Sequence, residues 1–187
     1  MTKALHPNYD FNLSMSHRAE RNPENAKFQD YFFEISHVSS LKVGVGKKLN
    51  LGVLSRRYSA KTTEVRFSQH FVISSGGNPR IVHRLGLEQR LFPDETRFRI
   101  RYRLGFDSPL NGMNVDPGEP YFLGNIESLS TLVANQKTKF EQRISLGLGH
   151  FVNAKLRYQG VFQLRLKDMG QNSEEQLFGV IGVYVKL

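Results

Sequence analysis

The chain has 187 residues, no cysteine, no tryptophan and a formal net charge of +9. This length allows one domain with a sizeable interior, and the lack of cysteine excludes disulfides, thiolate metal sites and cysteine nucleophiles. No apolar stretch approaches the roughly 18 residues of a membrane helix, and the start MTKALHPNYDF lacks the apolar region of a signal peptide. If the protein is exported, we expect that its signal has been removed.

Ten segments alternate apolar and polar residues, which predicts β-strands because successive side chains of a strand point to opposite faces. In chain order the segments are 8–17, 28–45, from 49 onward, 62–74, 81–91, 96–106, 121–131, 138–148, 155–166 and 176–187. The polar run Arg18–Lys27 ends the first predicted strand and separates it from the second. Lys47 and Lys48 mark a tight turn, and FPDE (92–95) marks another. Short connections and an even strand number predict an all-β, antiparallel up-and-down barrel that forms a single domain over residues 1–187.

The clearest strand is TRFRIRYRLGF (96–106). Its apolar side chains, from Phe98 to Phe106, share one face, and four arginines share the other. The arginine face needs either open water or a partner row of carboxylates. Basic residues are spread over the strands in the same way rather than gathered in one block, so we expect no nucleic-acid partner.

Alternation alone does not separate a soluble barrel with an apolar core from a membrane barrel with an apolar outside. The long strands favour a transmembrane barrel in the bacterial outer membrane, in contact with outer-membrane lipid and lipopolysaccharide. Aromatic residues near the strand ends fit the girdles of such a barrel. These residues are Tyr9, Tyr31, Phe92, Phe106, Tyr121, Phe140, Phe151 and Tyr158.

The polar face then becomes a narrow lumen rich in arginine and glutamate. A tight FPDE hairpin sets Glu88 opposite Arg99, and we expect Arg99 and Arg101 to contact mainly Glu88 and Glu127. The expected lumen ion-pair network consists of Glu64, Arg66, Arg84, Glu88, Arg97, Arg99, Arg101, Arg103, Glu127, Glu141 and Arg143. Such a network fills the interior of a small barrel, and a selective path for anions is the alternative.

The sequence offers little for catalysis. Its six histidines show no metal-binding spacing. His70 is the one in phase with the polar face, together with Ser68 and Glu64, but no nucleophile motif surrounds the serine. We expect no catalytic residue, no metal and no cofactor.

Four segments resemble a known family. They are RIVHRLGLEQRLF, TRFRIRYRLGFDSPLNG, EPYFLGNIESL and TKFEQRISLGLGHFVNAKLRYQGVFQ. They are similar to the bacterial outer-membrane family catalogued as domain of unknown function 2490. The matching positions are Arg84, Glu88, Gln89, Arg90, Arg99, Arg101, Tyr102, Arg103, Asn125, Glu127 and Arg143. The resemblance implies a small outer-membrane barrel and no assigned reaction.

We therefore expect a non-enzymatic outer-membrane barrel that is structural, an accessory subunit or a narrow plugged pore. Two alternatives remain open: a lipid-modifying hydrolase of the outer membrane and a soluble, lipocalin-like ligand-binding barrel. With an even number of strands, both termini and the loop 108–120 face the periplasm, and FPDE faces outward.

Overall fold

The computed structural model describes residues 2–6, 8–21, 28–59, 62–169 and 173–185. Its strands are β1 (Thr2–His6), β2 (Tyr9–Arg21), β3 (Phe28–Gly44), β4 (Lys47–Tyr58), β5 (Thr63–Ser74), β6 (Arg80–Leu91), β7 (Thr96–Pro109), β8 (Glu119–Val133), β9 (Lys139–Asn153), β10 (Leu156–Lys167) and β11 (Glu174–Val185). Within these ranges there is no helix with the length and apolar character needed to cross a membrane.

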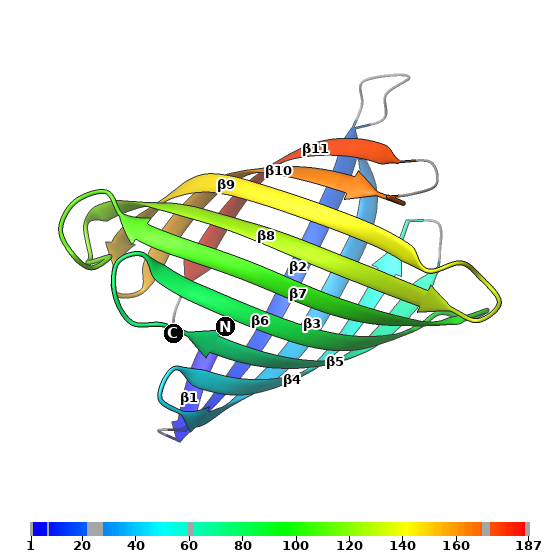
Figure 1. Cartoon of the computed structure of the whole chain (residues 1–187), viewed down its shortest axis with the longest axis horizontal. Helices are drawn as coiled ribbons and strands as arrows, with labels where there is room; N and C mark the ends of the chain where they lie inside the picture. The colour runs from blue at the N-terminus through cyan, green and yellow to red at the C-terminus, as the bar shows by residue number, and fades with distance from the viewer. Residues whose placement is uncertain (1, 7, 22–27, 60–61, 170–172, 186–187) are drawn as a thin grey trace.

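All strands belong to one antiparallel sheet, in which each strand pairs with the next along the chain. The sheet curls strongly, so that β2 and β3 cross behind β6 to β8 (Figure 1). The prediction of an all-β, up-and-down arrangement of ten long strands, here β2 to β11, is confirmed. The described ladders run from β1 to β11 and include none that joins the two edge strands, so the structure shows a barrel-like curled sheet.

The register around the arginine strand is also as predicted. Phe92 N donates to Glu95 O over 2.9 Å and closes the FPDE turn, and Glu88 is the Cα partner of Arg99. The same ladders set Arg84 opposite Arg103 and Arg103 opposite Glu127. Charged residues of neighbouring strands therefore lie side by side on one face of the sheet.

This charged face lies inside the curl, and the apolar face lies outside. Within β6, Leu85 and Leu87 are 53% and 54% exposed, whereas Glu88 and Arg90 are 4% and 6% exposed. The buried polar side chains are Glu64, Glu88, Arg90, Asn125, Glu127, Thr131 and Ser145. The sequence therefore places its polar residues where most globular proteins place an apolar core.

Local details differ from the sequence-based expectations. The turn after β3 lies at Val45–Gly46, where Gly46 has a φ of 66°, and Lys47 and Lys48 already belong to β4. β2 continues to Arg21, whereas residues 22–27, and residues 186–187 of the predicted last strand, lie outside the described ranges. The short strand β1 lacks a long alternation and was not predicted.

Two of the aromatic residues assigned to girdles are directed elsewhere. Tyr121 is 3% exposed and points into the interior, where its hydroxyl accepts a hydrogen bond from Gln159 Nε2 over 2.8 Å. The ring of Phe92 lies beside Arg97, with 4.5 Å from the guanidinium carbon to the ring centroid. For Tyr31 the structure describes only the backbone. Tyr121 is thus directed inward by its phase within β8, whereas Phe92 lies in the turn that follows β6.

Candidate functional site

Glu64 on β5 is the most deeply buried charged residue among those described, with 0% exposure. Its Oε1 accepts hydrogen bonds from Arg66 Nη2 over 2.6 Å and from Arg90 Nε over 2.7 Å. Its Oε2 accepts from Arg90 Nη2 over 2.9 Å and from the Tyr58 hydroxyl over 2.8 Å. Because Arg66 and Arg90 are Cα partners on β5 and β6, the register delivers both guanidinium groups to this carboxylate. The bidentate pairing compensates the desolvation of the charges.

Arg56 on β4 links this cluster to β3. Its Nε donates to Glu34 Oε2 over 2.8 Å, and its Nη1 lies 3.8 Å from Glu64 Oε2. The guanidinium carbon lies 4.1 Å from the ring centroid of Phe32, which is a cation–π contact. The arginine therefore bridges two glutamates while an aromatic ring covers its planar face.

Glu88 on β6 extends the contacts in the other direction. Its Oε2 lies 3.9 Å from Arg66 Nη1, and its Oε1 lies 3.1 Å from Arg101 Nη2. Arg101 on β7 also faces β8, with 3.5 Å between its Nη1 and Glu127 Oε1. One arginine thus neutralises a glutamate on each of its two neighbouring strands.

Arg143 on β9 completes the series. Its Nη1 lies 3.1 Å from Glu127 Oε2, and its Nε donates to Glu141 Oε1 over 2.7 Å. The result is a continuous series of ion pairs across β3 to β9, which we call the ion-pair belt. It consists of Glu34, Arg56, Glu64, Arg66, Glu88, Arg90, Arg101, Glu127, Glu141 and Arg143.

We expected Arg99 to contact Glu88 or Glu127, but it lies beside the belt and contacts neither. Its Nε donates to Thr131 Oγ1 over 3.0 Å, and no carboxylate of the described residues lies within 4 Å of its guanidinium. Arg101, two residues along the strand, contacts both of these glutamates and reaches Glu88 diagonally.

Arg97, also expected in the network, lies outside the belt. It pairs with Glu95, its neighbour two residues earlier, through a hydrogen bond of 2.6 Å from Nε to Oε1. Glu95 is the last residue of FPDE, Arg97 follows it two residues later, and both side chains are partly exposed.

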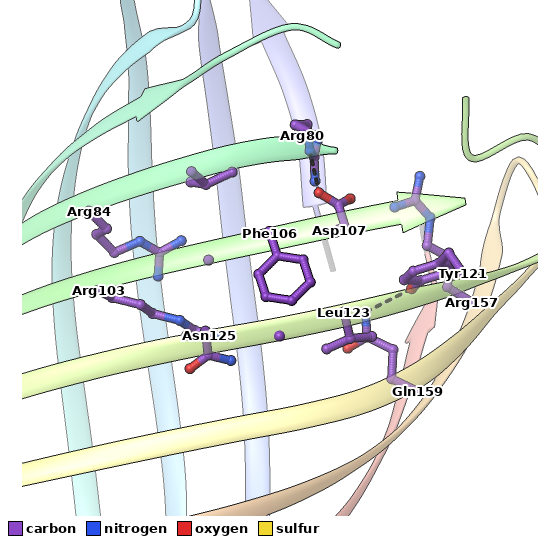
Figure 2. A pocket seen from close by; sticks show the side chains of 13 residues that line it. Arg80, Arg84, Arg103, Phe106, Asp107, Tyr121, Leu123, Asn125, Arg157 and Gln159 are labelled. Atoms are coloured by element: carbon purple, nitrogen blue, oxygen red, sulfur yellow. Dashed lines mark hydrogen bonds and ion pairs between the residues drawn. The ribbon is translucent and has the colours of Figure 1, made fainter. Parts of the chain in front are cut away.

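Arg84 and Arg103, also expected in the network, have no carboxylate partner within 4 Å in the described part of the chain. Both line a pocket of about 200 Å³, together with Gly105, Asn125 and other residues of β6, β7, β8 and β10. Figure 2 shows the two side chains extending from adjacent strands in the same direction, with Asn125 beside Arg103. This is the one part of the expected network in which like charges face each other without a described acid between them.

A second and larger cavity, about 650 Å³, lies at the other end of the sheet, on the side of FPDE. We call it the FPDE-end chamber. Its charged lining residues are Arg56, Arg66, Arg90, Arg97, Arg99, Arg101, Glu141, Arg143, Arg165 and Lys167. Most of these arginines contact belt glutamates, so the belt forms the floor of the chamber.

The possible catalytic set is not assembled. Ser68, His70 and Glu64 share the interior face of β5, but the oxygens of Glu64 accept from arginines and Tyr58. His70 lies near a different acid, with 3.9 Å between its Nε2 and Glu88 Oε1. The described residues form no hydrogen bond between Ser68 and His70, and hold no group of three or more metal-binding side chains.

Several residues of the site lie outside the network expected from the sequence. Arg90, Arg56 and Glu34 were not in the expected network, although Arg90 was among the positions that match the family. Tyr58, which donates to Glu64, and Thr131, which accepts from Arg99 beside the belt, were also not predicted. Arg90 has the same parity as Glu88, and Arg56 has the opposite parity to the exposed Leu51 and Val53, so strand phase was the available signal. Strand phase predicts which face a residue lies on, but not the direction in which a long side chain extends along that face.

The comparison with family models gives one match: the model described as "Protein of unknown function (DUF2490)" matches residues 1–179. No curated protein and no solved structure matches the chain significantly. Because the family model covers nearly the whole chain, and because the sequence motifs point to the same family, the chain belongs to the DUF2490 family.

Proposed function

We propose that the protein is a non-enzymatic β-barrel of the bacterial outer membrane whose interior is narrowed by the ion-pair belt between the FPDE-end chamber and the Arg84–Arg103 pocket. The observation that supports this most is the inversion of the two faces of the sheet. On β7, Phe98 and Ile100 are 53% and 47% exposed on the outside, while Arg101 between β6 and β8 contacts two buried glutamates.

The outer face supports a lipid environment. Leu85, Leu87, Phe98 and Ile100 are neighbours on β6 and β7 and form a continuous apolar surface. Soluble monomers rarely expose large contiguous apolar patches, whereas membrane barrels require an apolar band. A lipocalin-like barrel would place its apolar residues inside, so the face inversion disfavours that alternative.

Strand length agrees with this environment. The strands β4 to β11 contain 12 to 15 residues each, and a tilted strand needs about 9–11 residues to cross the hydrocarbon layer. The remaining residues reach the interfaces at both ends.

The contacts within the belt favour a plugged interior over an open pore. Side chains of seven consecutive strands meet in it through contacts of 2.6–3.9 Å. Such a barrel has a structural or accessory role, or conducts weakly. Because the arginines of the belt are bound to glutamates, they are held in place and are not free to act on a substrate.

Reconstitution and fractionation test this proposal. We expect the protein in the outer-membrane fraction, a shift in gel migration on heating, and small or absent conductance in planar bilayers. Recovery in a soluble fraction without detergent would contradict the membrane assignment. Release of fatty acid from phospholipid vesicles, abolished by His70→Ala, would contradict the non-enzymatic assignment.

Orientation can be tested separately because the chain has no cysteine. We expect Asp94→Cys, in the FPDE turn, to react with a membrane-impermeant maleimide on intact cells. Met113→Cys, in the loop between β7 and β8, should react only after the outer membrane is opened. Both positions are exposed, and Met113 is 78% exposed, so the reverse pattern would place the FPDE turn in the periplasm.

A further inference from the structure

We propose that the pocket lined by Arg84 and Arg103 binds a phosphate-class oxyanion. The inference goes beyond the proposed function, which assigns no ligand, and it depends on the interior geometry rather than on membrane location. The pocket lies at the end of the sheet opposite to FPDE, where β6 begins and β7 ends.

The first argument is an uncompensated charge. Arg84 and Arg103 are Cα partners on β6 and β7 and both face the interior. Arg84 Nε is buried and has no hydrogen-bond partner. Two half-buried guanidinium groups held side by side repel each other and lose part of their solvation, so the arrangement costs free energy unless an anion joins them.

The nearby acids are already engaged. Glu127 is the Cα partner of Arg103, but its oxygens face Arg101 and Arg143 at 3.5 Å and 3.1 Å. Asp107, at the rim of the pocket, accepts a hydrogen bond of 2.8 Å from Arg80 Nε. Within the described residues, no carboxylate remains for the two arginines.

The second argument is space. Gly105 occupies the interior-facing position between Arg103 and Asp107, and a Cβ built there would lie no closer than 3.8 Å to any atom. The pocket of about 200 Å³ is therefore open because this position has no side chain. It is smaller than the roughly 300–1,000 Å³ of pockets for drug-sized molecules, which favours a small anion or a single phosphoryl group.

The third argument is chemistry. A guanidinium group presents a planar fork of N–H donors that matches phosphate oxygens in a bidentate manner. The side-chain amide of Asn125, which is 9% exposed, adds a donor to the same pocket. Free phosphate and the phosphate of a lipid headgroup share this chemistry.

The FPDE-end chamber is also rich in arginine but differs in the state of its charges. Its arginines Arg56, Arg66, Arg90 and Arg143 contact glutamates of the belt. Arg99 in the chamber also has no such contact, but it donates to Thr131. The Arg84–Arg103 pair places two guanidinium groups without such a contact on neighbouring strands, and it is therefore the better anion site.

Titration of the purified protein in non-ionic detergent with inorganic phosphate tests the proposal by calorimetry. We expect saturable binding that Arg84→Gln and Arg103→Gln each weaken by about tenfold or more, since the loss of a charge-assisted contact corresponds to at least this factor. Binding that is absent, or unchanged in both variants, would overturn the proposal.

A second pair of variants covers the case in which the arginine variants do not fold. Gly105→Val adds a branched side chain inside the pocket, at a position where a Cβ makes only ordinary van der Waals contacts, and we expect it to abolish phosphate binding. Gly160→Val is the matched control, because a Cβ on Gly160 meets no atom within 4 Å and Gly160 does not line the pocket. Equal phosphate binding by these two variants would place the ion elsewhere and overturn the assignment.

A competition experiment distinguishes a free phosphate ion from the phosphate of a lipid headgroup as the ligand. Mixed micelles that contain phosphatidic acid are added to the phosphate-loaded protein, with phosphatidylcholine micelles as the control. Displacement by phosphatidic acid alone indicates a headgroup ligand, and no displacement indicates a free phosphate ion. Both outcomes support the site, whereas equal displacement by both micelles would contradict recognition through a terminal phosphate.

Discussion

The ion-pair belt and the Arg84–Arg103 pocket use the same residue type for opposite purposes. In the belt, each arginine contacts at least one glutamate, and Glu64 is fully buried among Arg66, Arg90 and Tyr58. In the pocket, two arginines face each other across β6 and β7 without a described acid. An arginine in the interior is therefore not informative by itself, because its role depends on whether a neighbouring group already pairs with it: a glutamate in the belt, or the Thr131 hydroxyl at Arg99.

The sheet register explains how this difference arises. Glu88 lies opposite Arg99 and Glu127 lies opposite Arg103. Arg101 is midway between these two levels and contacts one oxygen of each glutamate. Arg99 is left with Thr131, and Arg103 is left facing Arg84.

The largest effect is expected for Glu64→Gln. This substitution leaves the guanidinium groups of Arg66 and Arg90 without their main partner, and breaking a buried pair costs about 3–5 kcal/mol. Urea unfolding in detergent measures the free energy of unfolding. A loss below about 1 kcal/mol, the level of an exposed pair, would show that the belt is solvated and does not stabilise the sheet.

A smaller effect is expected for Glu88→Gln. Arg101 keeps Glu127 and Arg66 keeps Glu64, so the substitution weakens the belt without isolating an arginine. We expect the free energy of unfolding to fall by about 1–3 kcal/mol. A larger loss of stability than that of Glu64→Gln would show that Glu88 on β6, and not Glu64 on β5, contributes most to the stability of the belt.

Thr131→Val should have the smallest effect. It removes the hydroxyl that accepts from Arg99 Nε and keeps the shape of the side chain. Because Arg99 also lines the FPDE-end chamber and stays in contact with solvent, we expect a loss of about 1 kcal/mol. A much larger loss would mean that Arg99 belongs to the belt in energetic terms.

The sequence predicts the fold better than the site because the two depend on different features. Strand phase and the FPDE turn determine which residues face inward, and both are local, so Glu88 was correctly set opposite Arg99. Ion pairing depends on how far a flexible side chain reaches along the strand axis. That reach brings Arg101 to Glu88 and separates Arg84 and Arg103 from the belt.

The same limit applies to residues outside the expected network. Arg90 binds Glu64 from the neighbouring strand, and its phase marks it as interior-facing, but phase names no partner. β1 is too short for a periodic pattern, and it forms because it pairs with β2.

The most direct test of the account compares Arg90→Gln with Arg84→Gln by urea unfolding in phosphate-free detergent solution. Both arginines lie on β6, face the interior and receive the same substitution. We expect Arg90→Gln to lower the free energy of unfolding by about 1–3 kcal/mol, because Glu64 loses the two hydrogen bonds from Arg90 but keeps those from Arg66 and Tyr58. Arg84→Gln should leave the stability unchanged or raise it, because it removes a repulsion. An equal loss of stability in the two variants would contradict the division of the interior into a compensated belt and an uncompensated binding pair.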